Sequence, residues 1–93
     1  MKTVVIAESA GKPREAIMAV YPRHKAVVDR SCAQGVVLGI GPFVEGGNMA
    51  IFTTREAAES FVKEDPFILE GLVREFRLRD WADSLLPDGG PPR

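Results

Sequence analysis

Strand and helix patterns alternate along this chain, and their order constrains the fold more than any other feature. Short β-branched or apolar runs bounded by glycine and proline are typical of strands, and four segments have this character: residues 3–7, 36–40, 49–53 and 72–79. Helix-forming sequence separates the first two segments and again the last two. The expected order is therefore strand, helix, strand, strand, helix, strand.

The proline at position 22 divides the helical sequence between the first two predicted strands. Residues 14–20 contain good helix formers and predict a short helix. Because proline suits the first turn of a helix, we expect the main helix to begin at Pro22 and to end at Gly35. Its inward stripe follows the i, i+3, i+4, i+7 spacing: His24, Val27, Val28 and Ser31. The single histidine of the chain is therefore expected on or beside the inward face of that helix.

A second helix is predicted to end before Pro66, because a residue that precedes proline disfavours helix. Either Thr53 or Thr54 can cap its start, and Thr53 with Glu56 matches a capping box. Its apolar stripe has helical spacing: Ala57, Ala58, Phe61 and Val62. The sequence therefore predicts an amphipathic helix between the third and fourth strands.

These elements predict a ferredoxin-like α+β sandwich. A tight hairpin at residues 45–48 joins the two middle strands, and right-handed crossovers place both helices on one face of a four-stranded sheet. Neighbouring strand residues point to opposite faces, so the apolar residues of the strands cannot all point at the helices. The residues concerned are Val4, Ile6, Val37 and Phe52. We therefore expect a homodimer in which the open face of the sheet packs against a second subunit.

Composition argues against several classes of function. The 93-residue chain fits one domain, expected over residues 1–84, with a flexible Gly/Pro-rich tail at residues 85–93. A formal net charge of −1 without a basic stripe argues against nucleic acid, and no apolar run approaches the ~20 residues of a membrane span. The single cysteine, Cys32, forms no internal disulfide, which suits a cytoplasmic protein, and one cysteine with one histidine predicts no metal site. We expect no cofactor either, since Gly46-Gly47 indicates a turn and not a phosphate loop, because no helix follows it.

The stretch most informative about chemistry is Asp65-Pro66-Phe67, in which proline holds a carboxylate at a rigid position. A helix that folds back beside it would bring His24 to Asp65. The positive end of the helix dipole disfavours a charged imidazole in the first turn, whereas a nearby carboxylate favours it. Such a histidine can act as a general acid or base while Asp65 orients its ring. The structural alternative is that Asp65 caps a short helix over residues 67–70 and His24 is a partly buried, hydrogen-bonded side chain.

Several spaced motifs together resemble the YciI-like, or YCII-related, family. They are Pro22-Arg23-His24, Gly41-Pro42-Phe43, Asp65-Pro66-Phe67 with Gly71-Leu72, and Leu78-Arg79-Asp80-Trp81. The resemblance extends from the first strand to Trp81 and implies a ferredoxin-like fold of the dimeric α/β-barrel type. It also implies a pocket with a His–Asp pair, which corresponds here to His24 and Asp65. Some relatives remove chloride from a chlorinated hydroxyquinol. Position 21 is Tyr21, where relatives often carry arginine.

The expected site combines two catalytic residues, His24 and Asp65, with three ligand-binding residues, Tyr21, Phe43 and Phe67. For these three rings, ordinary packing in the core is the alternative. The expected function is that of a cofactor-free lyase or isomerase, similar to a dehydrochlorinase, which acts on a small metabolite. A non-catalytic small-ligand-binding or dimerisation module is the alternative, because the sequence has no evident nucleophile, metal-ligand set or cofactor loop.

Overall fold

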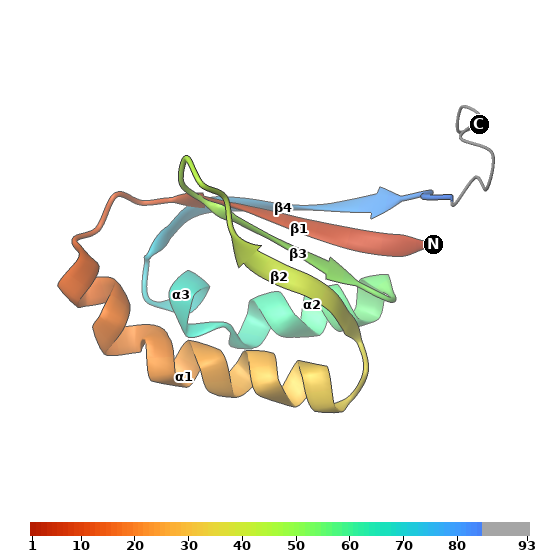
Figure 1. The fold of residues 1–93 in the computed structure, drawn as a ribbon, viewed down its shortest axis with the longest axis horizontal. Coiled ribbons are helices and arrows are strands. Elements are labelled where there is room, and N and C mark those ends of the chain that lie inside the picture. The colour runs from red at the N-terminus through yellow and green to blue at the C-terminus, as the bar shows by residue number, and fades with distance from the viewer. Residues whose placement is uncertain (85–93) are drawn as a thin grey trace.

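The computed structural model describes residues 1–84, which form a four-stranded sheet with three helices beside it (Figure 1). In chain order the elements are β1 (Lys2–Ser9), α1 (Arg14–Ala33), β2 (Val37–Pro42), β3 (Asn48–Phe52), α2 (Arg55–Glu64), α3 (Pro66–Leu69) and β4 (Val73–Trp81). The predicted order of strands and helices is therefore the observed one, with α3 as a single extra turn. The predicted flexible tail at residues 85–93 lies outside the described residues.

The sheet is antiparallel throughout, with the strand order β2-β3-β1-β4. The three helices lie on one side of it, below the strands in the view of Figure 1. This topology is compatible with a ferredoxin-like fold, and the prediction of an α+β fold is confirmed. Because two helical crossovers return to the same sheet, residues from α1, α3 and the central strands meet in the space between the sheet and the helices.

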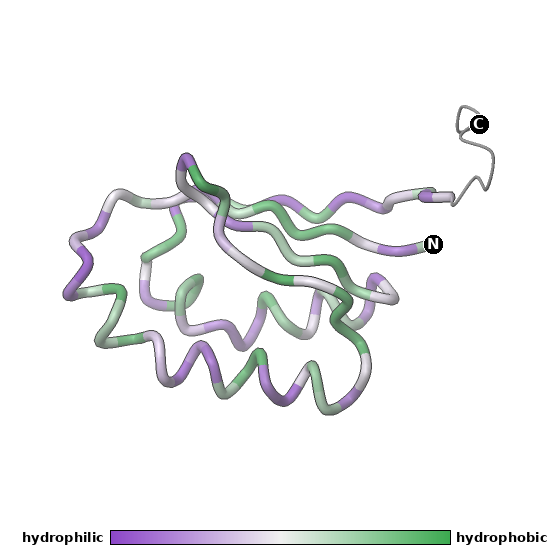
Figure 2. Tube along the Cα trace, viewed as in Figure 1, coloured by the Kyte–Doolittle hydropathy of each residue, from purple (hydrophilic) through white to green (hydrophobic). Residues whose placement is uncertain are grey.

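The core lies between the sheet and the helices. Its buried apolar residues come from β1, β3, α1 and α2: Val5, Ala50, Phe52, Val27, Ala58, Phe61 and Val62. Phe52 is fully buried, and its ring centroid lies 5.1 Å from that of Phe61. Full burial of one large apolar side chain contributes about 1.5–3 kcal/mol, so this cluster accounts for much of the adhesion between the two layers. Figure 2 shows the matching pattern, with hydrophobic and hydrophilic residues alternating along α1 and α2.

The prediction that the main helix begins at Pro22 is wrong. Helix α1 runs without interruption from Arg14, and Pro22 lies inside it. Proline removes the hydrogen bond to the carbonyl four residues earlier, here that of Met18, and bends the helix. Met18 and Pro22 are both exposed, so water can satisfy that carbonyl, while buried Val20 anchors the preceding turn. Figure 1 shows the resulting bend between the first turns of α1 and its longer second part.

The predicted capping box of Thr53 with Glu56 is also wrong, because α2 begins one residue later. The Thr53 amide donates to the Val36 carbonyl at 2.9 Å, which holds Thr53 beside β2. Thr54 is the N-cap instead, and its Oγ1 accepts a hydrogen bond of 3.1 Å from the Ala57 amide. The short helix α3 likewise begins one residue earlier than predicted.

The two faces of the sheet have different neighbours. On the helix side, Thr3 Oγ1 donates to Asp80 Oδ1 at 2.9 Å, and Arg55 Nη1 of α2 donates to the same oxygen at 3.1 Å. Val37 and Phe52 also face the helices, whereas the register of β1 turns Val4 and Ile6 to the open face. The open-face residues of β1 and β3 are Val4, Ile6, Met49 and Ile51, and β4 adds Glu75, Arg77 and Arg79.

None of the helices in the described part of the chain combines the length and the apolar character that a membrane span requires.

Candidate functional site

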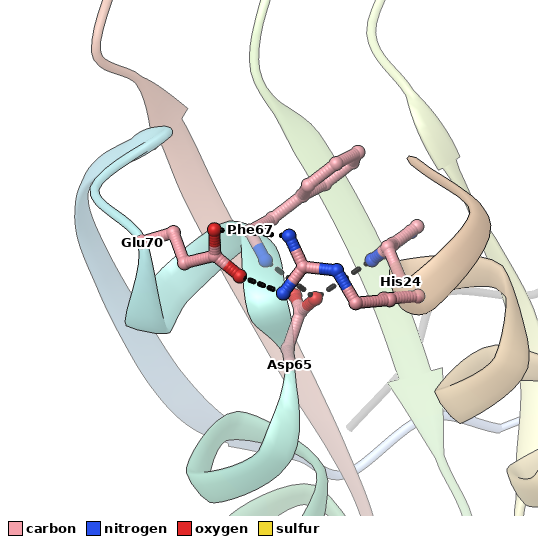
Figure 3. Close-up of polar contacts among 5 residues, drawn as sticks. His24, Asp65, Phe67 and Glu70 are labelled. Atoms are coloured by element: carbon pink, nitrogen blue, oxygen red, sulfur yellow. Dashed lines mark hydrogen bonds and ion pairs between the residues drawn. The ribbon is translucent and has the colours of Figure 1, made fainter. Parts of the chain in front are cut away.

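His24 and Asp65 contact each other although they lie on different elements. His24 is in the middle of α1, and Asp65 occupies the junction between α2 and α3. His24 Nδ1 lies 2.7 Å from Asp65 Oδ1, and the side chains are only 13% and 6% exposed (Figure 3). The predicted influence of the helix dipole on His24 is wrong, because α1 begins at Arg14, more than two turns away, and that influence is limited to the first turn. The carboxylate is therefore the main polar partner of the ring.

Asp65 also caps α3. Its Oδ1 accepts a hydrogen bond of 3.1 Å from the Phe67 amide, so one oxygen accepts both bonds, as Figure 3 shows. Pro66 occupies the start of the helix, where its missing N–H costs nothing. An ionised carboxylate only accepts hydrogen bonds, so with Asp65 ionised the shared proton lies on His24 Nδ1. Neutral His24 then carries its free lone pair at Nε2.

Aromatic packing fixes the orientation of the imidazole ring. The His24 ring stacks on Phe67 with centroids 3.9 Å apart and planes 7° apart. Phe61 approaches it edge-on at 6.4 Å, and Tyr21 lies at 6.1 Å. Within residues 1–84, Nε2 has no protein hydrogen-bond partner, and no sealed side-chain nitrogen or oxygen is left unpaired. Nε2 is therefore accessible from the space beside the ring.

That space is a cavity of about 410 Å³ between the helices and the sheet. All five residues predicted for the site line it: Tyr21, His24, Phe43, Asp65 and Phe67. Tyr21 and Phe43 are partly exposed at the wall, whereas Phe67 is buried under the His24 ring. The structure brings the five residues to one place, and their catalytic and binding roles stay predictions. A separate, shallower hollow of about 490 Å³ lies near Lys2 and Asp83 and contains none of the five.

The cavity also has walls that the sequence did not indicate. Ile17 comes from the part of α1 before Pro22, and the hairpin between β2 and β3 contributes Gly46 and Gly47. Gly47 has a φ of +80°, and a Cβ built there would lie 2.7 Å from the Ala7 carbonyl oxygen. The Gly-Gly pair is a recognisable turn signal, but its close approach to β1 has no counterpart in the sequence pattern.

Two ion pairs flank the cavity. Arg23 binds Glu70 through both terminal nitrogens, with Nη2 and Oε1 3.0 Å apart, and this joins α1 to the end of α3. The hydrogen bond from Arg23 lowers the pKa of Glu70, and the same bond raises the pKa of Arg23. At the other side, Arg74 Nη2 lies 2.5 Å from Glu8 Oε1. Within the described residues, no three His, Cys, Asp or Glu side chains are grouped as metal ligands.

No protein-family model matches this chain, and no curated protein matches it. Among solved structures, one similar protein is 5-chloro-2-hydroxyhydroquinone dehydrochlorinase from Burkholderia phenoliruptrix, in complex with 2,5-dihydroxybenzoquinone. The TM-score is 0.75 at 18% sequence identity, and the match covers 90% of this chain and 96% of that chain. At this identity the likeness concerns the fold, so the described part of the chain has the fold of that dehydrochlorinase.

Proposed function

We propose that this protein is a YciI-like lyase or isomerase that acts on a small ring compound without a cofactor. The observation that carries the proposal is the 2.7 Å contact between His24 Nδ1 and Asp65 Oδ1 inside a cavity to which Nε2 has access. The fold shared with a dehydrochlorinase supports the same class of reaction. A ring hydroxyl placed beside Nε2 is the group on which this histidine acts.

In the proposed reaction, the proton of another ring hydroxyl first moves to the chlorine-bearing carbon, which gives the keto tautomer with that carbon tetrahedral. His24 Nε2 then takes the proton of the hydroxyl beside it, and the electron pair of that O–H bond forms a second carbonyl. The ring electrons shift to form a C=C bond at the tetrahedral carbon, and chloride departs with the electron pair of the C–Cl bond, so the overall change is loss of HCl. Asp65 stabilises the imidazolium and holds its ring in place. The stack on Phe67 keeps Nε2 aimed into the cavity. Positioned acid–base catalysis of this kind contributes about 10²–10⁴-fold in rate.

Chloride release from chlorinated hydroquinones, measured with oxygen excluded, tests the proposal. We expect turnover by the wild type, and a kcat at least about 100-fold lower in His24→Gln. Lys25→Gln is the matched control, because Lys25 is the next residue of α1 and its side chain is 55% exposed. Equal rates for wild type and His24→Gln would remove His24 from the mechanism.

A second candidate is a non-catalytic module that binds a small ligand in the same cavity. It is favoured by the double use of Asp65 Oδ1, since capping of α3 alone is a sufficient reason for that carboxylate. This candidate predicts ligand binding without turnover for every compound in the series, and equal ligand affinity for the wild type and Lys25→Gln.

We further propose that two copies pack through their open sheet faces in the dimeric α/β-barrel arrangement. The apolar side chains of Ile6 and Ile51 form a patch on the open face, and in a monomer only water would cover this patch. Along β4 this face carries Glu75 towards one end and Arg79 towards the other. A twofold axis across the face would bring opposite charges together, which favours a second copy as the partner. The cytoplasmic location stays a prediction.

A further inference from the structure

The charged groups around the cavity limit the ligands that it can hold. Among the described residues that line it, the acidic and basic side chains are Glu8, His24 and Asp65. Lysine and arginine are absent from this part of the lining. The Glu8 carboxylate is already bound by Arg74, so a carboxylate that enters meets one carboxylate without an arginine partner, Asp65, and one imidazole.

The two arginines next to lining residues are already paired with carboxylates. Arg23 directly precedes His24, but its guanidinium binds Glu70 and is 59% exposed. Arg74 binds Glu8 and is 63% exposed. A guanidinium fork that is matched to one carboxylate has few donors left for a second anion. Neither arginine therefore compensates a negative charge inside the cavity.

The His24–Asp65 pair does not supply a positive charge either. With His24 protonated, the imidazolium and the carboxylate of Asp65 sum to zero. With His24 neutral, the pair carries one negative charge. In both states Nε2 can form a hydrogen bond with a ligand, but the pair has no net positive charge that would attract an anion.

Apart from Ser9 and Asn48, the rest of the lining is apolar or aromatic. Its rings are those of Tyr21, Phe43, Phe61 and Phe67, and its aliphatic groups include Ile17 and Val5. Such walls favour a flat ring, which buries a large area against other rings. An ionised carboxylate in the same place loses its hydration without a compensating partner, which is costly.

We propose that this cavity selects uncharged ring compounds and rejects their carboxylate-bearing analogues, with Tyr21 as the position that decides this preference. The inference names the ligand class of the site in the proposed function and rests on that proposal. Tyr21 lies on the cavity wall one turn before His24, is 42% exposed, and can offer a neutral hydroxyl to a ligand. An arginine at this position would place a guanidinium in the lining.

Calorimetric titration with three matched rings tests the preference, with oxygen excluded. The probes are hydroquinone, 2,5-dihydroxybenzamide and 2,5-dihydroxybenzoate, of which the amide and the carboxylate have nearly the same size. We expect the amide to bind within about threefold of hydroquinone and the benzoate at least about tenfold more weakly than the amide. A benzoate that binds as tightly as the amide would overturn the inference, as would failure of both neutral rings to bind at millimolar concentration.

Two variants separate charge from shape. Tyr21→Arg is expected to tighten the benzoate at least about tenfold relative to the amide, because it supplies the missing cation. Met18→Arg adds the same charge to an exposed position of α1 outside the cavity lining, and we expect the wild-type preference to persist. An equal shift in both variants would refute a role for the cavity itself.

The outcomes also separate this inference from the proposed function. Selective binding of the neutral rings without turnover would remove the proposed lyase activity and leave the inference standing. Tight binding and turnover of a carboxylated ring would refute the inference and support the proposed lyase activity.

Discussion

Replacement of Asp65 tests the double role of its carboxylate in the folded state. In Asp65→Ala, the Phe67 amide loses its cap and His24 Nδ1 loses its partner at a site where Asp65 is 4% exposed. Loss of an N-cap costs about 1 kcal/mol, and loss of a hydrogen bond that involves a charged group costs about 1.5–3 kcal/mol. We therefore expect the free energy of unfolding to fall by about 2.5–4 kcal/mol.

Asp65→Asn is the matched control, because the asparagine side-chain oxygen can accept from both groups but carries no charge. We expect a loss of about 1 kcal/mol, clearly smaller than in Asp65→Ala. Urea denaturation followed by circular dichroism measures both values. If alanine and asparagine cost the same, or if alanine costs less than about 0.5 kcal/mol, the two hydrogen bonds do not have the energetic role assigned to them.

A double-mutant cycle isolates the histidine contact from the cap. His24→Ala is combined with Asp65→Ala, in which the loss of the cap cancels between the two arms of the cycle, and the coupling is the part of the loss that is not additive. Because the two side chains share a short, nearly buried hydrogen bond, we expect a coupling of about 1–2 kcal/mol. Additive losses would mean that the contact contributes nothing to stability.

Three further predictions concern other parts of the fold. Gly47→Ala is expected to destabilise the protein by about 1–3 kcal/mol in thermal denaturation, because its Cβ would lie 2.7 Å from a β1 carbonyl oxygen. Gly46→Ala should cost less, because a Cβ at position 46 would have no atom within contact distance. Hydrogen bonds from a β1 threonine and an α2 arginine lower the pKa of Asp80 in the folded state. The ionised Asp80 carboxylate therefore stabilises the fold above its unfolded-state pKa of about 3.9, and this stabilisation is lost as the pH falls through the lower folded-state pKa. The stability difference between wild type and Asp80→Asn should therefore be present at neutral pH and vanish in strong acid; a constant difference would contradict this account. Ile6→Glu should convert the proposed dimer to a monomer in light scattering, while Val44→Glu, at the exposed tip of the hairpin, should not; a monomeric wild type at micromolar concentration would rule the dimer out.

Interactions between near neighbours in the chain were readable from the sequence. Asp65 caps a helix through an amide two residues away, and Pro66 fixes the backbone at the same place, so this junction was predictable to within one residue. The apolar stripe of α2 and the alternation of the strands are local patterns of the same kind. The order of the elements then restricts the topology, because crossover connections are right-handed.

The start of α1 was not readable, because a proline inside a helix depends on its surroundings. Proline at a first turn and an exposed proline in a bent helix look alike in sequence, and only packing separates them. Here buried Val20 holds the turn before Pro22 against the core, while Met18 and Pro22 lie on the exposed side of the helix. The misplaced start of α1 also led to the wrong account of the helix dipole at His24.

By itself, the sequence determined the rhythm of strands and helices, the capped turn at Asp65 and the residue types available for proton transfer. The tertiary structure decided which of these residues meet. His24 and Asp65 are 41 positions apart, and only the packing of α1 against α3 brings them to 2.7 Å. The pairing of Arg23 with Glu70 and of Arg74 with Glu8 was decided in the same way. The reason is physical: local patterns depend on backbone hydrogen bonds within a few residues, whereas the chemistry of a cavity depends on side chains that only the packed layers bring together.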